Sequence, residues 1–353
     1  MSKLKIGVIG TGSISDSHLQ SYANHPEAEI YAVCDLNVER AREKAASYGA
    51  SKVYADYHEM LADPQLQAVS ICTWNNTHAP VSIAALKAGK HVLVEKPLCK
   101  TVEEALRIEE AVRESGCVLQ VGFVRRYSST AAILKELIDA GELGEIYYAK
   151  ASSLRRLGNP GGWFADKERS GGGPLIDIGV HILDICWYLM GKPKVRSVSA
   201  NTYKRLGNRS NVKGLSFYKA ADYDASKNDV EDLANALIRF ENGASLMVDV
   251  SFTLHAKKDE TSIKLYGDKG GAELEPELLL VSEKNDTILN ITPQVDHSTF
   301  HFADSFQNEI NHFVDSALGR KETLSPVRDG VEMMKMLCAI YESAETGTEI
   351  RLS

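Results

Sequence analysis

An aspartate and a histidine stand four residues apart in an apolar segment and are suited to acid–base chemistry. Asp177 and His181 lie in Pro174–Met190, a predicted helix with apolar side chains at most other positions. Residues i and i+4 share one stripe of a helix, and burying such groups is costly unless they are paired or used. An imidazole titrates near neutral pH. We expect Asp177 and His181 to be catalytic, with helix capping as the alternative for Asp177, and we expect a structural role for Asp184.

A lysine at a strand end is the third candidate. Glu95, Lys96 and Pro97 directly follow the predicted strand His91–Val94, and open α/β sheets bind ligands beyond the carboxyl ends of their strands. Most lysines are solvated surface charges, but this position favours a role in a site. There the ammonium group could hydrogen-bond a reacting oxygen and stabilise developing negative charge. The segment Thr73–His78 follows the preceding strand and is expected at the same crevice.

Two glycines and a later acid indicate a dinucleotide site. Gly10 and Gly12, in G-T-G-S-I-S, follow a predicted strand and open a predicted helix, as the dinucleotide-binding motif requires. Gly10 permits the tight turn, and Gly12 lets the backbone approach a pyrophosphate. Ser15 takes the third position, where glycine or alanine is usual. Asp35 ends the second strand about twenty residues later, where an acid meets the ribose hydroxyls.

The residues after Asp35 favour NAD over NADP. Leu36 offers nothing to a 2′-phosphate, although Arg40, a turn into the next helix, could reach one. NAD is therefore the expected cofactor, with NADP as the alternative. The residues expected to contact it are Gly10, Gly12, Ser13, Ile14, Asp35, Thr73, Trp74, Asn75, His78, Glu95 and Lys96.

These candidates need a parallel sheet to position them. In the first third of the chain, short apolar runs alternate with amphipathic helical stretches, which is typical of a parallel sheet covered on both faces. The expected strands are Lys5–Ile9, Ile30–Cys34, Ala68–Cys72, His91–Val94 and Val118–Gly122. The expected helices between them are His18–Asn24, Val38–Tyr48, Val81–Ala88 and Val102–Ser115. After about Val124, predicted strands are joined by turns such as Asn242-Gly243, which indicates an open, mainly antiparallel sheet.

The expected fold class is α/β, in two domains. An N-terminal Rossmann dinucleotide-binding domain is expected over residues 1–123, and an α+β domain for substrate binding and oligomerisation over 124–353. The polar stretch Tyr203–Asn228 is predicted to be a long loop over the active site.

Composition excludes several classes of protein. The chain has 353 residues, a net charge of −8 and no basic block, so nucleic-acid binding is not expected. No apolar run approaches the roughly 20 residues that span a bilayer, and the N-terminal glycines argue against a signal peptide. The six cysteines are scattered, as in proteins of a reducing compartment, and the cytoplasm is expected. No clustered metal ligands appear, so no metal is expected.

The motifs together resemble those of the Gfo/Idh/MocA oxidoreductase family, and the similarity covers essentially the whole chain. They are G-x-G-x-x-S at the start, E-K-P near residue 95, and G-G-G-P-L-I-D-I-G-V-H ending at His181. The resemblance implies a Rossmann domain and an open-sheet domain whose outer face often forms dimers or tetramers. It also implies a catalytic lysine, aspartate and histidine, at Lys96, Asp177 and His181. Asn75 and His78 match a segment near the nicotinamide.

The expected reaction moves a hydride between a nicotinamide and a hydroxyl or keto carbon of a sugar or cyclic polyol. In oxidation, His181 removes the hydroxyl proton, Asp177 orients the imidazole or binds a neighbouring hydroxyl, and Lys96 stabilises the alkoxide. The alternatives are an NADPH-dependent reductase of a related carbonyl compound and a non-catalytic dinucleotide sensor.

A loop before the predicted catalytic helix could shape the substrate pocket. Its polar and aromatic side chains, which suit the hydroxyls and the apolar face of a sugar, are Arg155, Arg156, Asn159, Trp163 and Phe164. The alternative is an ordinary surface or oligomer-contact loop. The residues expected to contact substrate are Lys96, Arg126, Arg155, Trp163, Asp177 and His181.

Overall fold

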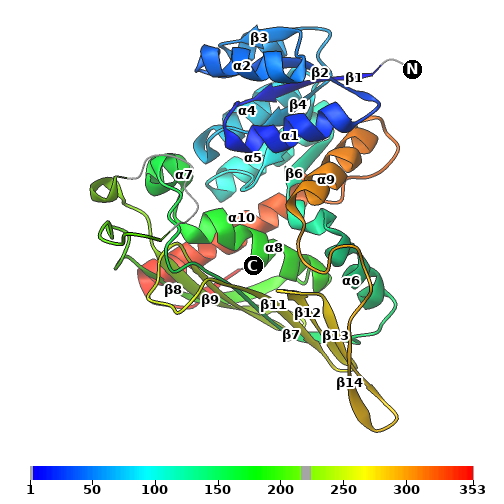
Figure 1. Cartoon of the computed structure of the whole chain (residues 1–353), viewed down its shortest axis with the longest axis vertical. Coiled ribbons are helices and arrows are strands. Elements are labelled where there is room, and N and C mark those ends of the chain that lie inside the picture. The colour runs from blue at the N-terminus through cyan, green and yellow to red at the C-terminus, as the bar shows by residue number, and fades with distance from the viewer. Residues whose placement is uncertain (1–2, 216–223, 353) are drawn as a thin grey trace. The chain divides into compact units, whose positions relative to one another are not determined.

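The computed structural model describes residues 3–215 and 224–352, which form two compact units (Figure 1). The first unit contains Met1–Val124 and Phe302–Met334, and the second contains Arg125–His301 and Lys335–Ser353. The predicted Rossmann domain is thus one unit together with a later segment of the chain.

The stretch 302–334 departs from the expected division into 1–123 and 124–353, because it belongs to the first unit. It contains helix α9 (Phe302–Ala317) and the start of α10 (Val327–Thr346). The buried face of α9 explains this placement, since Ile310 and Phe313 lie in the same core cluster as strand residues near the N-terminus. The expected second domain therefore loses this segment.

The first unit is built on a six-stranded sheet in the order β3-β2-β1-β4-β5-β6, with every pair parallel. Its strands are β1 (Leu4–Ile9), β2 (Ala28–Cys34), β3 (Lys52–Tyr54), β4 (Ala68–Ile71), β5 (His91–Glu95) and β6 (Leu119–Gly122). This order confirms the doubly wound fold and puts the switch point, where such folds bind ligands, between β1 and β4. The five expected strands are present, whereas the short edge strand β3 was not predicted.

Helices connect these strands. They are α1 (Ser13–Asn24), α2 (Val38–Tyr48), α3 (Tyr57–Leu61), α4 (Asn75–Lys87) and α5 (Val102–Ser115). Side-chain oxygens of Asn37 and Thr101 cap α2 and α5 by accepting backbone N–H groups of the first turn. Helices α2 and α5 have the expected bounds. Helices α1 and α4 begin earlier than expected, at Ser13 and Asn75, because the first turns of these two helices are mainly polar and carry little apolar periodicity.

The second unit contains a nine-stranded sheet in the order β14-β13-β12-β11-β7-β10-β9-β8-β15. Its strands are β7 (Ile146–Leu154), β8 (Val195–Tyr203), β9 (Leu233–Phe240), β10 (Ser245–Ser251), β11 (Glu260–Gly267), β12 (Gly270–Glu275), β13 (Leu279–Lys284), β14 (Thr287–Ile291) and β15 (Ile350–Arg351). Neighbours are antiparallel except β7 and β10. The expected open, mainly antiparallel sheet is confirmed.

Helices cover one face of this sheet (Figure 1). They are α6 (Ser129–Asp139) and α8 (Val180–Leu189), with a π-helical turn (Leu175–Gly179) directly before α8. Burial alternates along β9 and β10, so one set of side chains faces the helices and the other set remains partly exposed. The shorter helices are Val124–Tyr127, Gly162–Ala165, α7 (Lys167–Ser170) and Ala225–Lys227.

The predicted loop Tyr203–Asn228 begins at the last residue of β8. Its first part is held by the buried Asp232 carboxylate, which accepts backbone N–H groups of Arg205, Leu206 and Gly207. The prediction that this loop lies over the active site also depends on residues 216–223, which lie outside the described residues.

None of the helices in the described part of the chain has the length and apolar character needed to cross a membrane.

Candidate active site

The turn after β1 contains two glycines in different surroundings. Gly10 has a φ of 88°, and a Cβ there would lie 2.6 Å from the carbonyl oxygen of Cys72, just after β4. Only glycine fits this position. A Cβ on Gly12 would meet no atom within 4 Å, so the packing of the protein does not itself require glycine there. This open space adjoins the N-terminus of α1, where backbone N–H groups favour an anion such as a pyrophosphate.

The rest of the motif fits the same arrangement. Ser15 is fully buried, and its hydroxyl donates to the carbonyl oxygen of Gly12 at 2.6 Å, so a serine satisfies its polar group where glycine or alanine is usual. Ser13 is exposed and Ile14 is partly exposed at the start of α1. These two side chains remain accessible to a dinucleotide.

We expect the two glycines to respond differently to alanine. Gly12→Ala should leave the thermal midpoint nearly unchanged and raise the NADH dissociation constant about 10-fold, because its methyl group enters the space left for the pyrophosphate. Gly10→Ala should destabilise the fold by about 1–2 kcal/mol or more, through its positive φ and the contact with Cys72. Calorimetry and NADH fluorescence titration measure both quantities. Equal destabilisation by the two variants would contradict this interpretation.

Asp35 follows β2 and holds the glycine turn in place. One carboxylate oxygen accepts the Thr11 backbone N–H at 2.7 Å and the Thr11 hydroxyl at 2.9 Å, and the other accepts the Asn37 N–H at 2.8 Å. The Arg40 guanidinium donates to both oxygens at 2.8–2.9 Å. Burial raises the pKa of Asp35, but these hydrogen bonds outweigh it and hold the pKa below its ordinary value. Asp35 is therefore ionised at neutral pH, with Arg40 bound to it.

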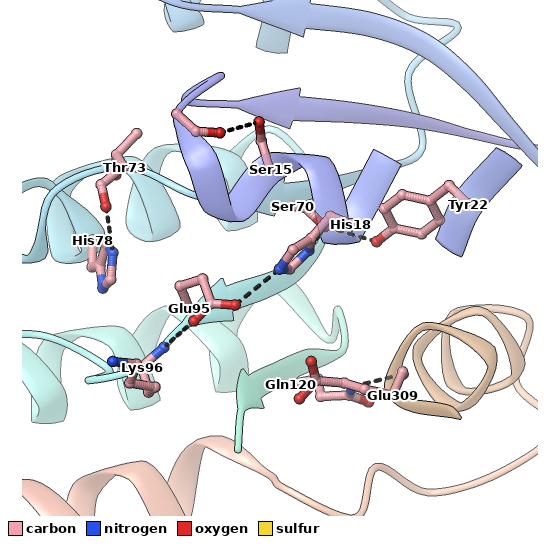
Figure 2. A network of polar contacts seen from close by, with 11 residues as sticks. Ser15, His18, Tyr22, Ser70, Thr73, His78, Glu95, Lys96, Gln120 and Glu309 are labelled. Atoms are coloured by element: carbon pink, nitrogen blue, oxygen red, sulfur yellow. Dashed lines mark hydrogen bonds and ion pairs between the residues drawn. The ribbon is translucent and has the colours of Figure 1, made fainter. Parts of the chain in front are cut away.

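Lys96 is the accessible residue at the end of β5. Within the described stretch 92–99, every residue is buried except Lys96. The buried Glu95 carboxylate accepts the Lys96 backbone N–H at 3.2 Å and contacts His18 Nε2 at 2.9 Å (Figure 2). The Glu95 side chain thus supports the turn that carries Lys96, and its contact with the cofactor stays a prediction.

His78 also supports this turn. It is 1% exposed, its Nδ1 lies 2.7 Å from the Pro97 carbonyl oxygen, and its Nε2 lies 3.2 Å from the Thr73 carbonyl oxygen. Burial lowers the pKa of His78, so the ring is neutral and donates one N–H, which the shorter distance assigns to Nδ1. The predicted contact of His78 with the cofactor stays a prediction. The ring links the end of β4 to the E-K-P turn.

The remaining candidates lie between β4 and the body of α4. The Thr73 hydroxyl accepts the Thr77 hydroxyl at 2.7 Å. Trp74, at the N-cap of α4, is 39% exposed, whereas Asn75 is buried in the first turn. Thr73 and Trp74 are thus accessible at the carboxyl end of β4, beside the switch point of the sheet.

Asp177 and His181 occupy the accessible stripe of a buried helical segment in the second unit. In the described stretch 175–189, all residues except these two are buried. Asp177 lies in the π-helical turn, in which the Val180 N–H donates to the carbonyl oxygen of Leu175. Such turns are rare and are frequent at functional sites. Asp177 and His181 are thus both partly exposed, as a shared stripe requires, and their joint role stays a prediction.

A second carboxylate fixes the start of this segment. Glu231, which is 4% exposed, accepts the backbone N–H groups of Gly173 at 2.9 Å and Leu175 at 3.2 Å, and the Tyr341 hydroxyl at 2.9 Å. A Cβ on Gly173 would lie 2.2 Å from the Glu231 carbonyl oxygen, and one on Gly172 would lie 2.0 Å from the Tyr341 hydroxyl. The glycine run is therefore required by close packing against these two residues.

Arg126 is structural, contrary to the prediction that it binds substrate. Its side chain is fully buried, with Nη2 2.5 Å from one oxygen of Asp184 and Nε 2.9 Å from the other. The guanidinium also lies over the Tyr188 ring, 4.8 Å from its centre. The ion pair fastens the short helix Val124–Tyr127 to α8 and gives Asp184 the structural role expected for it.

Breaking this ion pair should destabilise the second unit without affecting substrate binding. Asp184→Asn should lower the free energy of unfolding by about 3–5 kcal/mol, because the Arg126 charge stays buried without its counter-ion. Urea denaturation measures the loss, and the KM of the folded fraction should be unchanged. A stable variant with a raised KM would instead support substrate binding by Arg126.

The loop before the helical segment is held by its own backbone contacts. Arg155 donates to the carbonyl oxygen of Gly158 at 3.2 Å, Asn159 accepts the Gly161 N–H at 2.9 Å, and Trp163 stacks on Phe164 with ring centres 4.0 Å apart. Arg155 and Trp163 are partly exposed, whereas Asn159 is buried. Substrate contact by Arg155 and Trp163 stays a prediction.

The three predicted catalytic residues thus belong to two units: Lys96 to the first, and Asp177 and His181 to the second. Each is accessible in a stretch that is otherwise buried. His18 and Glu231 belong to no local motif, because their partners are remote in the sequence.

Comparisons with known proteins cover nearly the whole chain. A model described as an oxidoreductase family with an NAD-binding Rossmann fold matches residues 4–123, and the C-terminal α/β domain model of the same family matches residues 135–352. The D-glucoside 3-dehydrogenase of Escherichia coli (strain K12) is 33% identical over 354 residues, covering 99% of this chain and 98% of that protein.

Two further matches agree with these. The scyllo-inositol 2-dehydrogenase (NAD(+)) of Bacillus subtilis (strain 168) is 30% identical over 355 residues, covering 99% of this chain and 96% of that protein. The solved structure of a levoglucosan dehydrogenase in complex with NADH has a TM-score of 0.87 at 24% identity and covers 100% of both chains. The structural match shows a shared fold.

Proposed function

This chain belongs to the Gfo/Idh/MocA oxidoreductase family, and we propose that it is an NAD-dependent dehydrogenase of a secondary hydroxyl group on a sugar or cyclic polyol ring. The observation that carries the proposal is the accessible Asp177–His181 stripe on a segment whose other residues are buried. An acid and an imidazole in that position suit proton transfer from an alcohol. The relatives at 33% and 30% identity are named for activity on a glucoside and an inositol.

The first unit supplies the groups that would hold NAD. The space beside Gly12 and the N-terminus of α1 suit the pyrophosphate, and Asp35 suits the ribose hydroxyls. The proposed contact set is completed by Ser13, Ile14, Thr73, Trp74, Asn75, His78, Glu95 and Lys96. When bound, NAD accepts the hydride from the carbinol carbon, and the protein supplies placement and proton transfer.

The chain's own residues handle the proton and the charge. In oxidation, His181 takes the proton of the hydroxyl group as the carbon–oxygen double bond forms, and it returns a proton in reduction. Asp177, one turn earlier, orients the imidazole or binds a neighbouring hydroxyl of the ring. The Lys96 ammonium donates a hydrogen bond to the reacting oxygen and stabilises its negative charge.

We further propose that the open face of the nine-stranded sheet forms the interface of a homodimer or homotetramer. This face carries the partly exposed side chains of β9 and β10, among them Leu237 and Met247. Apolar groups on an uncovered sheet face are typical of association surfaces.

The state of the cysteines bears on the compartment. All six cysteines are free, which supports the proposal of a cytoplasmic protein.

A substrate panel tests the proposed activity. Methyl β-D-glucoside, levoglucosan, myo-inositol, scyllo-inositol and glucose are each incubated with the protein and NAD or NADP. Keto sugars are incubated with NADH or NADPH, and the absorbance of the reduced cofactor is followed in both sets. We expect reduction of NAD by at least one ring alcohol. Turnover only with NADPH and keto sugars would favour the reductase, and tight NADH binding without turnover of any compound would favour the dinucleotide sensor.

A further inference from the structure

A chain of buried polar groups leads from α1 to Lys96 inside the first unit (Figure 2). The Tyr22 hydroxyl lies 2.7 Å from the Ser70 hydroxyl on β4, which lies 3.2 Å from His18 Nδ1. His18 Nε2 lies 2.9 Å from one carboxylate oxygen of Glu95, and the other oxygen accepts the Lys96 N–H at 3.2 Å. Four of these side chains, those of Tyr22, Ser70, His18 and Glu95, are buried.

The hydrogen-bonding capacities of these groups give the chain one direction. A carboxylate only accepts, so His18 donates from Nε2 to Glu95, and the tautomer with its hydrogen on Nε2 accepts at Nδ1 from the Ser70 hydroxyl. The Ser70 oxygen in turn accepts the Tyr22 O–H, and burial raises the pKa of Tyr22 so that it remains a donor. Every donor has an acceptor, and the chain ends on the ionised Glu95.

Packing leaves the Glu95 carboxylate little freedom. A Cβ on Gly122 of β6 would lie 3.2 Å from the Glu95 Cα and 3.4 Å from its carboxyl carbon, so the glycine makes room for the acid. His18 of α1 contacts the same carboxylate, and its ring packs on Phe306 of α9 with ring centres 5.5 Å apart. The acid is held between β6 and α1.

The charges around Glu95 favour its ionised form. Burial raises the pKa of Glu95, but the hydrogen bond and the electrostatic interaction with His18, followed by the charge of Lys96, outweigh it and hold the pKa below its ordinary value. The other titratable groups facing it are His78 of α4, whose pKa is lowered by burial, and Cys72 after β4, whose pKa is raised by burial; Glu309 of α9 faces Cys72 as well. His78 and Cys72 are therefore neutral near pH 7.

We propose that His18, fixed by Ser70 and Tyr22, is a positioning residue for Lys96 that acts through Glu95. By donating to Glu95, it keeps a negative charge and a hydrogen-bond acceptor at the Lys96 backbone, so the turn holds the Lys96 side chain in place for the reacting oxygen. This inference rests on the proposed dehydrogenase function. It assigns a catalytic purpose to a buried histidine that does not itself touch the substrate.

The test compares His18→Leu with His18→Gln, because the glutamine amide can still donate to Glu95 from the position of Nε2. We expect His18→Leu to lower kcat about 10- to 100-fold at neutral pH, with KM and the NADH dissociation constant changed less than about 3-fold. Without the His18 donor, burial dominates and Glu95 binds a proton at higher pH. The acidic limb of kcat should therefore move upward by about one pH unit or more, with partial recovery in alkali. His18→Gln should restore most of the loss.

His312→Leu is the matched control, since His312 also makes backbone hydrogen bonds in the first unit but is not joined to the chain of Figure 2. It should lower stability and leave the pH profile of kcat unchanged. If the wild type is active and His18→Leu alters neither kcat nor the pH of its acidic limb, this inference is wrong, while the proposed function stands. A wild type that oxidises no ring alcohol would overturn the proposed function, and this inference with it.

Discussion

Replacing Lys96 by methionine should lower kcat about 10³-fold, while NADH binding is weakened far less than turnover and thermal stability stays close to that of the wild type. Methionine keeps the length of the side chain but removes the ammonium group that would stabilise the alkoxide. The measurements are steady-state turnover on the best compound of the panel and fluorescence titration with NADH. Lys87→Met, at the exposed end of α4, is the matched control and should behave as wild type.

His181→Ala should cause a loss of similar size, because the proton acceptor is removed. The double variant Lys96→Met/His181→Ala should be only slightly slower than either single variant, since groups that act on one transition state are strongly non-additive. Turnover of both single variants within about 10-fold of wild type would refute their catalytic roles.

Asp35→Ser should change the cofactor preference from NAD toward NADP. The substitution removes a carboxylate that would bind the ribose hydroxyls and repel a 2′-phosphate, and it releases the Arg40 guanidinium that Asp35 now holds at 2.8–2.9 Å. We expect kcat/KM for NAD to fall about 10- to 100-fold, as expected for the loss of charge-assisted hydrogen bonds, and kcat/KM for NADP to rise.

The double variant Asp35→Ser/Arg40→Ala separates these two effects. It should lose the activity with NAD to the same extent but should not gain activity with NADP, because the released cation is missing. A single variant that keeps the wild-type preference, or a double variant that still gains NADP activity, would contradict the roles given to Asp35 and Arg40.

Local signals in the sequence were sufficient for most of the fold. Helices α2 and α5 were located to the residue because a capping Asn37 or Thr101 precedes each and Gly49 or Gly116 follows it. Strand β14 was missed because all of its residues are exposed, so no apolar alternation marks it. The amphipathic face of α9 shows that one side is buried but not which sheet it covers.

Part of the candidate site could likewise be recognised from the sequence, and part could not. Gly10, Gly12, Asp35, Lys96, Asp177 and His181 are recognisable because their neighbours in the sequence show their setting. His18 is not, since its partners Ser70 and Glu95 are 52 and 77 residues away. Arg126 was assigned to the substrate because its ion pair with Asp184, 58 residues later, is visible only in three dimensions.

Transfer of deuterium is the most direct test of the proposed reaction. A ring alcohol from the active part of the panel, labelled with deuterium on the carbon that is oxidised, is incubated with the protein and NAD, and the reduced cofactor is analysed by mass spectrometry. We expect each reduced cofactor to carry one deuterium, with a keto product formed in equal amount. Unlabelled NADH, or no reduced cofactor with any labelled ring alcohol, would show that the protein does not move a hydride from such a carbon to NAD.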